Sequence, residues 1–323
     1  MALVDKLVSQ ATKPEENTFI GTPIPIEDVK QIPVIGVPIV NGYDWLEKLI
    51  KSIDYPVKNL VIVNNNGSDK KLTRQLNNLI GNGGLHKPLI DKIHVINFPT
   101  NMGVAFAWNC IIKSFILEPF WIISNHDVEF TPGLLQEMFE AALDDKVCMV
   151  HPHRGNYTQG SFDLFLIKEN AIREVGLFDE NLYPAYGEDS DYIMRIKNTQ
   201  AVRVLGLNRI HKHGGKVPPG AALGSYVGTV DDYIKSKPIE EINEENYDES
   251  YFGVGGQTRK AGGDHLGARL TDVNWINYDY LNRKWGEYWR GTCPYDYPMN
   301  NPEMPQSYTT FDIDFVRKKH LGF

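Results

Sequence analysis

The chain has 323 residues, of which 42% are hydrophobic and 23% charged, and its formal net charge is −8 at pH 7. This length and apolar content predict a globular protein with a large core, built as one large domain or two smaller ones. The negative charge argues against nucleic acid as the main partner, because binding a phosphate backbone needs a concentrated basic surface. It is compatible with one bound nucleotide, since a metal ion and a few backbone N–H groups can hold a single diphosphate.

The cysteines and the apolar runs bear on where the protein works. Cys110, Cys148 and Cys293 are widely spaced and form neither a metal-binding motif nor an evident disulfide framework. This pattern favours a reducing compartment, in which such side chains serve as small buried apolar residues. No apolar run approaches the roughly 18–20 residues that cross a bilayer, and the start of the chain lacks the features of a signal peptide. We therefore expect a cytoplasmic protein with no transmembrane segment.

Strand and helix patterns alternate through the first two thirds of the chain. After a leader at 1–31, expected to pack on the surface, the apolar run at 32–40 predicts a buried parallel strand, and helical spacing follows at 43–53. Shorter strands are predicted at 60–63, 93–96, 121–124, 147–150, 162–167 and 202–207, with helices between most of them, including 132–143 and 169–175. This alternation predicts an α/β fold, with a mostly parallel sheet flanked by helices on both faces.

The C-terminal third has a different character. Glycine, proline and acidic residues dominate from about residue 216 to about residue 267, and tryptophan and tyrosine cluster at 272–290. We expect an irregular extension at 216–323, attached to an α/β domain at 32–215.

A buried strand turns abruptly polar between Trp121 and Pro132. In an open α/β sheet, groups that follow the carboxyl end of a strand are placed to bind ligands. Asn125, Asp127 and Glu129 place oxygen ligands two residues apart, which suits Mg²⁺ or Mn²⁺ and a diphosphate carried by the metal. The alternative is a loop that caps the helix predicted to begin near Pro132.

A second acidic cluster opens the helix predicted after Gly187. Glu188, Asp189 and Asp191 lie within four residues. Acidic residues in a first helical turn favour the helix dipole, so capping is the simpler interpretation. Three carboxylates so close together nevertheless cost energy unless a cation or a reacting proton offsets their repulsion. This cluster is therefore a candidate catalytic site.

These segments together resemble a GT-A-type glycosyltransferase of glycosyltransferase family 2 over about residues 32–215. Val63–Ser68 is similar to the family's V-D-N-G-S segment, with Asn65 in place of the acid that contacts the nucleobase. Asn101–Asn109 resembles the N-x-G-x-x-x-A-x-N segment along the nucleotide, and Asn125–Asp127 stands where the family has D-x-D. The most specific similarity is to the G-x-F-D-E…E-D-x-D…R block, which matches Gly176–Glu180, Glu188–Asp191 and Arg195.

The resemblance implies a nucleotide-sugar donor and a glycan acceptor, and it favours a UDP-sugar over other donors. It also implies a divalent cation, Mn²⁺ or Mg²⁺, held mainly by Asp127 with His213 or His211, although a His-x-His pair is as often structural. The implied donor-binding residues are Pro38, Val40, Asn41, Asn65, Ser68, Asn101, Gly103, Ala107, Asn125 and His126.

Sugar transfer also requires a group that takes the proton of the acceptor hydroxyl. Asp189 is the candidate base, and Glu188 and Asp191 are expected to raise its pKa or to orient the acceptor. Tyr186, beside the acidic cluster at 188–191, is a further candidate for acceptor contact. The aromatic rings of the 216–323 extension, the acceptor-side part of the resulting catalytic unit, either form a platform for a sugar or anchor the extension to the domain. Base-assisted attack opposite the leaving group predicts inversion at the anomeric carbon; a retaining mechanism stays open because sequence does not show the face of attack.

Two other functions compete with this interpretation. The first is a nucleotidyltransferase acting on sugar phosphates, a class that usually has a glycine-rich basic loop after its first strand; residues 37–42 contain no such loop. The second is a catalytically silent carbohydrate-binding or scaffold protein. The presence of Asp127, Asp189 and His213 argues against the second function.

Overall fold

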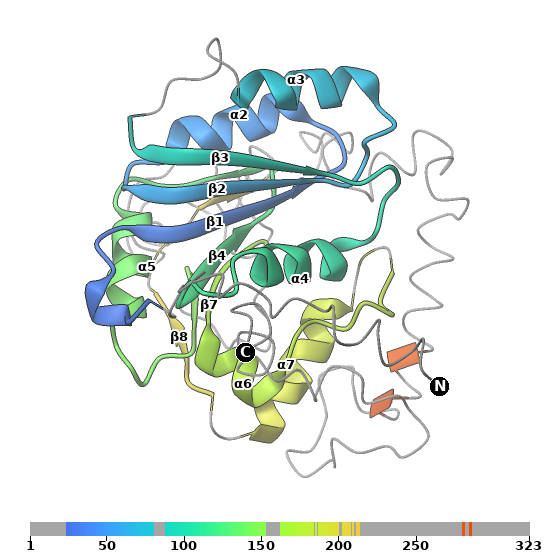
Figure 1. The fold of residues 1–323 in the computed structure, drawn as a ribbon. Helices are drawn as coiled ribbons and strands as arrows, with labels where there is room; N and C mark the ends of the chain where they lie inside the picture. Colours follow the sequence, from blue (N-terminus) through green and yellow to red (C-terminus); the bar gives the residue numbers. More distant parts are fainter. Residues whose placement is uncertain are drawn as a thin grey trace, which may run out of the picture.

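The computed structural model describes residues 24–80, 88–152, 162–183, 185, 187–199, 202–207, 209, 211–213, 280–281 and 284–285. Its main feature is a seven-stranded sheet (Figure 1). The strands of this sheet are β1 (Ile32–Ile39), β2 (Val57–Asn64), β3 (Ile90–Asn97), β4 (Phe120–Ser124), β6 (Met149–His151), β7 (Leu164–Lys168) and β8 (Val204–Gly206). Their spatial order is β3-β2-β1-β4-β7-β6-β8.

The sheet is mostly parallel, which confirms the predicted fold class. Strands β3, β2, β1 and β4 run parallel, and β6 runs parallel to β8. Only β7 is reversed, because it pairs antiparallel with both β4 and β6. Every residue of β1 is buried, as its unbroken apolar run predicts for a central strand covered on both faces.

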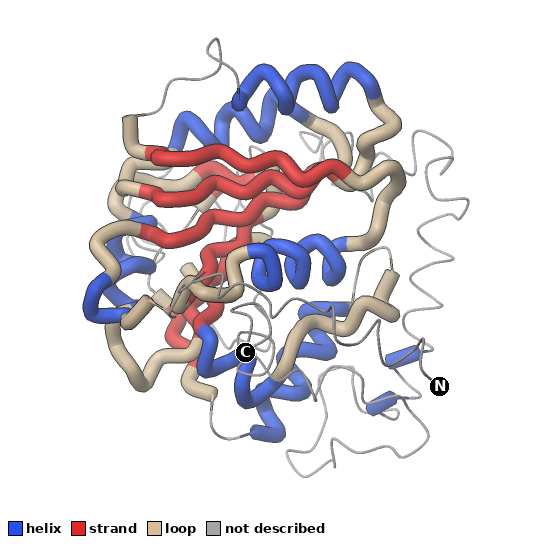
Figure 2. The backbone as a smooth tube through the Cα atoms, viewed as in Figure 1, coloured by secondary structure: helices blue, strands red, loops and turns tan. Residues whose placement is uncertain are grey.

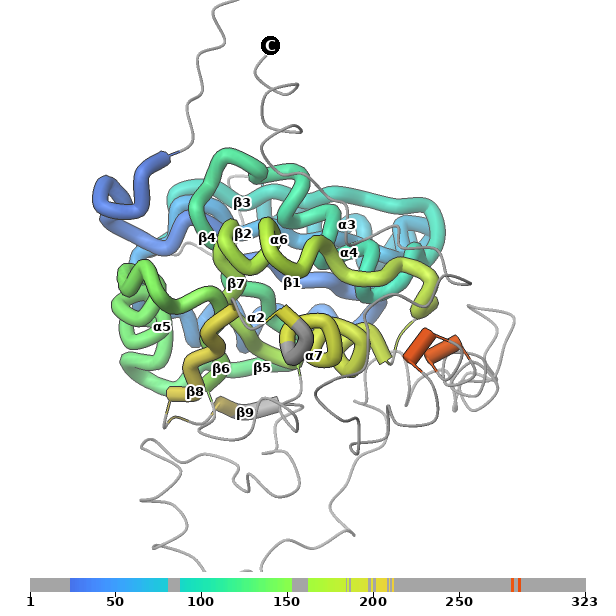
Figure 3. Tube along the Cα trace, turned by 90° about the horizontal axis from the view of Figure 1, so that it is seen from below, coloured from blue at the N-terminus to red at the C-terminus, as the bar shows by residue number. Residues whose placement is uncertain are grey.

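Helices cover both faces of the sheet (Figure 2). One face carries α2 (Tyr43–Ser52), α3 (Lys70–Ile80) and α5 (Leu134–Ala142); the other carries α4 (Val104–Ser114), α6 (Glu169–Val175) and α7 (Glu188–Thr199). Side chains alternate along each strand, so Ile122 packs in the first layer while Trp121 and Ile123 pack in the second. Figure 3 shows the second layer from below, where α6 lies over β7.

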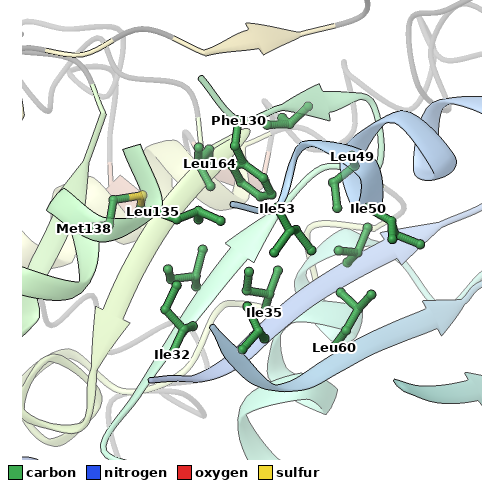
Figure 4. Packing of buried hydrophobic residues seen from close by; sticks show 14 of the residues in the cluster. Ile32, Ile35, Leu49, Ile50, Ile53, Leu60, Phe130, Leu135, Met138 and Leu164 are labelled. Carbon is green, nitrogen blue, oxygen red and sulfur yellow. The ribbon is translucent and has the colours of Figure 1, made fainter. Parts of the chain in front are cut away.

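The first layer is a continuous apolar core (Figure 4). Leu49 and Ile50 of α2, Ile35 of β1 and Leu135 of α5 belong to this core, and Ile53 lies between Leu135 and the two α2 side chains in this view. Full burial of each such side chain contributes about 1.5–3 kcal/mol. On the opposite face, a Cβ at Gly36 would lie 2.5 Å from Cγ2 of Ile111, so a glycine in β1 lets α4 approach closely.

Several local features differ from the predicted pattern. Strands β5 (Val128–Glu129) and β9 (Lys212–His213) form a separate antiparallel ladder, in regions where sequence predicted only polar loops. The α5 helix begins at Leu134 rather than near Pro132, after Gly133 at φ 79°. Ile80 is 54% exposed, although its spacing placed it on the apolar side of α3.

The described parts of the two flanking segments both contact the domain. At the N-terminal end, Ile24 donates a backbone hydrogen bond of 3.2 Å to the carbonyl of Leu117, and Ile26 and Val29 pack on the core. In the C-terminal third, Leu281 and Trp285 are buried. Residues 1–23, most of the 216–323 extension and Cys293 lie outside the described residues. Within the described ranges, no helix has the length and apolar character needed to span a membrane.

Candidate functional site

The loops that follow β1 and β2 are joined at one edge of the sheet. The backbone N–H of Asn65 donates to the carbonyl of Ile39 across 2.8 Å, and Nδ2 of Asn66 donates to the carbonyl of Val40 across 3.0 Å. Because parallel strands present their carboxyl ends at the same edge, these bonds fix the loops where an open α/β sheet binds ligands. The predicted donor residues Val40 and Asn41 lie here and are half-buried.

Asn65 presents a buried acceptor atom at this edge. Its side chain is 2% exposed, and its Nδ2 donates to the carbonyl of Gly103 across 3.1 Å. Within the part of the chain that the structure describes, its Oδ1 has no hydrogen-bond partner. A buried polar atom left unpaired costs about 1–3 kcal/mol, and such atoms call for a specific explanation, such as a ligand.

Asn101 and Gly103 shape the loop before α4. The N–H of Gly103 donates to Oδ1 of Asn101 across 2.8 Å, and Gly103 has φ 96°, a conformation that favours glycine. This turn brings the Gly103 carbonyl to Asn65. The predicted residue Asn101 therefore organises the loop, and its amide oxygen is used within the protein.

Three other predicted donor residues have different environments. Ser68 is exposed and donates to Oδ1 of Asn66 across 3.0 Å. Pro38 is buried within β1, where it pairs with Val63 of β2. Ala107 of α4 is fully buried in the core. Burial of both side chains places them in the core that surrounds the site rather than on an open surface.

The polar loop after β4 is tied to several elements. Asn125 donates its N–H to the carbonyl of Asp163 across 2.7 Å, and Ser52 of α2 accepts the N–H of Phe130 at 2.9 Å. His126 lies against Gly42: a Cβ at Gly42 would be 2.9 Å from Nε2 of His126. The loop therefore meets the end of β1 at the same edge of the sheet.

The β5–β9 ladder brings the predicted metal ligands into one region. Asp127 is 4% exposed, and the next residue, Val128, pairs with His213. His211 is buried, and its Nε2 lies 2.7 Å from Oδ2 of Asp163. Metal-binding histidines commonly contact a carboxylate through their other ring nitrogen, which orients the ring.

A carboxylate with one or two imidazoles is a donor set that fits a divalent cation such as Mn²⁺. Among the described side chains, no group of three or more His, Cys, Asp or Glu residues is arranged to hold a metal. The side chain of His213 falls outside that set. If a cation binds at this loop, Asp127 and a histidine would supply only part of its coordination shell, and phosphate oxygens and water would complete it.

Asp189 lies in the first turn of α7, close to the helix N-terminus. Its Oδ1 accepts the N–H of Ser190 at 2.6 Å and the hydroxyl of Ser190 at 3.3 Å. Burial by the surrounding protein raises the pKa of the Asp189 carboxyl and outweighs these hydrogen bonds, although part of the side chain remains accessible. A carboxyl with a raised pKa is better matched to proton transfer near neutral pH.

Asp191 occupies a different environment from the one predicted. It is fully buried; its Oδ2 accepts from Nε of Arg195 at 2.9 Å, and its Oδ1 accepts from Nε1 of Trp285 at 2.8 Å. Nζ of Lys284 lies 2.7 Å from the same Oδ1. Asp191 therefore has no surface for the acceptor contact that sequence predicted. Glu188, the first residue of α7, is 7% exposed, and Tyr186 lies outside the described residues.

Asn109 and Asp179 are structural parts of the site that sequence reasoning did not select. Asn109 of α4 donates through Nδ2 to the carbonyl of Phe178 at 2.8 Å and accepts the N–H of Phe178 at 2.9 Å. Asp179 follows directly and is fully buried. Asn109 belongs to the segment similar to N-x-G-x-x-x-A-x-N, and that position was the available signal.

Two contacts connect the loops of the predicted donor site with the segments on either side of the acidic cluster at Glu188–Asp191. Tyr183, in the loop before α7, donates its hydroxyl to the carbonyl of Asn101 across 3.1 Å. Phe162 packs against Tyr192 of α7 with ring centroids 6.3 Å apart, and its neighbour Asp163 holds Asn125. These contacts link the loop before α4 and the loop after β4 to the part of the chain that carries α7.

A polar edge on a parallel sheet, joined to carboxylates at a helix N-terminus, is typical of α/β enzymes that bind a nucleotide-linked donor. The family model described as glycosyl transferase family 2 matches residues 34–205. The chain belongs to this family.

Similar proteins include a galactofuranosyl glycosyltransferase from Leishmania donovani, which is 25% identical over 250 residues. The match covers 58% of this chain and 56% of the relative, so the chain spans just over half the length of that relative. A crystal structure of S. aureus TarS in complex with UDP-GlcNAc is 14% identical, with a TM-score of 0.43 over 81% of this chain and 88% of that chain. A structure of TarS in complex with UDP is 15% identical, with a TM-score of 0.40 over 55% and 57% of the two chains.

Proposed function

We propose that this chain moves a sugar from a UDP-sugar to a hydroxyl group of a glycan acceptor, with the aid of a divalent cation and with inversion at the anomeric carbon. The observation that carries the proposal is the position of Asp189, a partly accessible carboxyl with a raised pKa at the start of α7, a helix whose preceding loop contacts the carbonyl of Asn101 through Tyr183. The family indicates the class of reaction, and the residues of the site indicate its details.

Uridine fits the chemistry of Asn65. Uracil carries a hydrogen on N3 and can donate it to the Oδ1 atom that lacks a partner among the described residues. Cytosine has an unprotonated N3, which would place one acceptor against another. The buried atom therefore favours uracil over cytosine; guanine also has a ring N–H, on N1, and a comparison of UDP and GDP donors separates these two bases.

Asp127 would hold the cation, with His213 or His211 as a second protein ligand. A divalent cation stabilises the negative charge that builds on a leaving diphosphate. Asn125 and His126, on the same loop, would contact the donor beside it. The β5–β9 pairing supports this assignment because it links the strand that follows Asp127 to the one that ends at His213.

Asp189 would take the proton of the acceptor hydroxyl. As the acceptor oxygen bonds to the anomeric carbon, the bond from that carbon to the diphosphate breaks, and the proton passes to the carboxylate. Attack opposite the leaving group inverts the anomeric configuration. Glu188, at the start of the same helix, is the neighbouring candidate for acceptor contact, whereas Asp191 acts within the protein.

The experiment is to incubate the purified full chain with Mn²⁺ and a panel of nucleotide sugars, and to follow release of the nucleotide. Because the Leishmania relative is described as a galactofuranosyl glycosyltransferase, the panel includes UDP-galactofuranose beside UDP-hexoses and the matching CDP and GDP donors. Metal-dependent release of UDP supports the proposal. A parallel incubation with nucleoside triphosphates and sugar 1-phosphates tests the alternative, because a nucleotidyltransferase would form a nucleotide sugar there and release pyrophosphate. Absence of turnover with every donor would contradict catalysis.

A further inference from the structure

We propose that Lys284 and Trp285, far from the acidic block in sequence, are positioning residues that hold α7 so that Asp189 faces the acceptor. This inference rests on the proposed role of Asp189 as the base. It assigns part of the C-terminal third to the active site, even though neither residue touches the reacting atoms.

Lys284 joins two buried carboxylates. Its Nζ lies 2.7 Å from Oδ2 of Asp179 and 2.7 Å from Oδ1 of Asp191. Both carboxylates are 0% exposed, and the lysine side chain is 14% exposed. The first carboxylate belongs to the loop after α6 and the second to the first turn of α7, so this ammonium group links the two segments.

The charges of this cluster balance. Asp179 and Asp191 are matched by Arg195, which is fully buried, and by Lys284. Burial alone would raise the pKa of the Asp179 carboxyl, but Lys284 and the Tyr280 hydroxyl reverse that effect and lower it. Without Lys284, one carboxylate would be buried without a counter-charge, which is strongly unfavourable.

Trp285 binds the carboxylate of Asp191 while its ring lies in an apolar cluster. Its Nε1 donates to Oδ1 of Asp191 at 2.8 Å, while its ring packs with Leu281, Leu182 and Met194. Leu281 in turn fills the space above Gly187, where a Cβ would lie 2.9 Å from Cδ1 of the leucine.

The spacing of these residues explains how one short segment makes both kinds of contact. Residues 280, 281, 284 and 285 are helical. Residues four apart share a helix face, so Tyr280 and Lys284 together reach Asp179, while Leu281 and Trp285 together enter the apolar cluster.

A small shift of Asp191 would displace the proposed base. Asp189 lies two residues before it in the same helical turn, and the N–H of Asp191 donates to the Gly187 carbonyl at 2.8 Å. Misplacement of a reacting group by about 1 Å can cost roughly 10²-fold in rate. The donor edge has its own hydrogen bonds around Asn65, so this displacement should leave nucleotide binding intact.

The experiment compares Lys284→Met with wild type in the full chain, measuring kcat for transfer and the Kd for UDP by calorimetry. Methionine keeps the apolar stem and removes the charge. We expect kcat to fall by about 10- to 100-fold while the Kd for UDP stays within about 3-fold. Lys284→Arg keeps the charge and should recover part of the lost rate. The matched control is Lys113→Met. It removes an exposed lysine whose Nζ lies 3.5 Å from Oε1 of Glu180, the residue after Asp179. This control should leave kcat and the Kd for UDP unchanged.

Trp285→Phe provides the second measurement if Lys284→Met does not fold, because phenylalanine keeps an apolar ring and removes only the donor to Asp191. It should lower kcat with an unchanged Kd for UDP. Wild-type kcat in a folded Lys284→Met or Trp285→Phe protein, or a parallel loss of UDP binding, would overturn the positioning role. Absence of transfer by the wild-type chain would instead contradict the proposed function itself.

Discussion

Nε2 of His211 lies 2.7 Å from Oδ2 of Asp163, and both side chains are buried. The same aspartate accepts the backbone N–H of Asn125, at the start of the loop that contains Asp127. One residue therefore connects a histidine of the proposed metal site with the loop of its main carboxylate. If His211 takes part in metal binding, Asp163 sets the orientation of its ring.

Asp163→Asn tests this connection. We expect the affinity for Mn²⁺ to fall by about 10- to 100-fold, because the ring loses the carboxylate that orients it. The measurement is the Mn²⁺ concentration dependence of UDP binding, with Asp144→Asn as a surface control whose carboxylate is 46% exposed. A lower melting temperature of Asp163→Asn with unchanged Mn²⁺ affinity would show that His211 has a structural role only.

Asp127→Ala should abolish metal-dependent donor binding, because it removes the principal carboxylate ligand. Chelation of the metal with EDTA should have the same effect on the wild-type protein, and added Mn²⁺ should restore binding only in the wild type. Calorimetry with UDP and Mn²⁺ makes the comparison. An affinity equal to that of wild type would reject this role for Asp127.

Asp189→Asn should retain UDP binding and lose transfer. In the wild type, only the ionised carboxylate accepts a proton, so kcat should rise with pH through a midpoint above 3.8, the ordinary pKa of this group, since burial raises the pKa. A rate profile of the wild type against pH, beside the kcat of the variant, tests both points. Near-normal turnover by the variant would remove Asp189 as the base.

The same substitution has a predicted effect on stability. Because the pKa of Asp189 is raised in the folded state, that state binds more protons than the unfolded chain, so the free energy of unfolding falls as pH rises between the two pKa values. Asp189→Asn removes this loss and should be more stable than wild type at neutral pH. In denaturant unfolding, the difference in the free energy of unfolding between Asp189→Asn and wild type should shrink as pH approaches 3.8. Equal free energies for the two proteins, both at neutral pH and near pH 3.8, would contradict this prediction.

Asn65 is predicted to set the preference for uridine. Wild type should bind UDP more tightly than CDP, and Asn65→Ala should narrow that difference by about 10-fold, since loss of one buried hydrogen bond is worth about 1–1.5 kcal/mol. Competition calorimetry with the two diphosphates measures it. Asn65→Asp should change the affinity for UDP, because a carboxylate cannot donate a hydrogen bond to the Gly103 carbonyl as Nδ2 of Asn65 does. Equal discrimination in wild type and Asn65→Ala would exclude this contact.

Local patterns in the sequence were sufficient for most of the fold. The apolar run at 32–40 identified β1, and helical spacing with flanking breaks identified α6, observed at Glu169–Val175. The reversed direction of β7 was not predictable, because a buried run shows that a strand is covered but not which way it runs. The two-residue strands β5 and β9 are too short to produce a periodic pattern.

Parts of the site depend on contacts between distant residues, which local patterns do not reveal. Asp191 was predicted to contact the acceptor, but it is buried by Lys284 and Trp285 from a segment nearly a hundred positions away. Asp163 had no motif around it to single it out. The aromatic-rich segment was interpreted as either a sugar platform or an anchor, and the burial of Trp285 confirms the anchor for this residue.

In the proposed reaction, an acceptor activated by Asp189 displaces a metal-bound uridine diphosphate in a single step. Proton NMR of the product's anomeric signal, recorded early in a transfer reaction with Mn²⁺ and the active UDP-sugar, tests it most directly. We predict an anomeric configuration opposite to that of the donor. Retention of the donor's configuration would contradict the account.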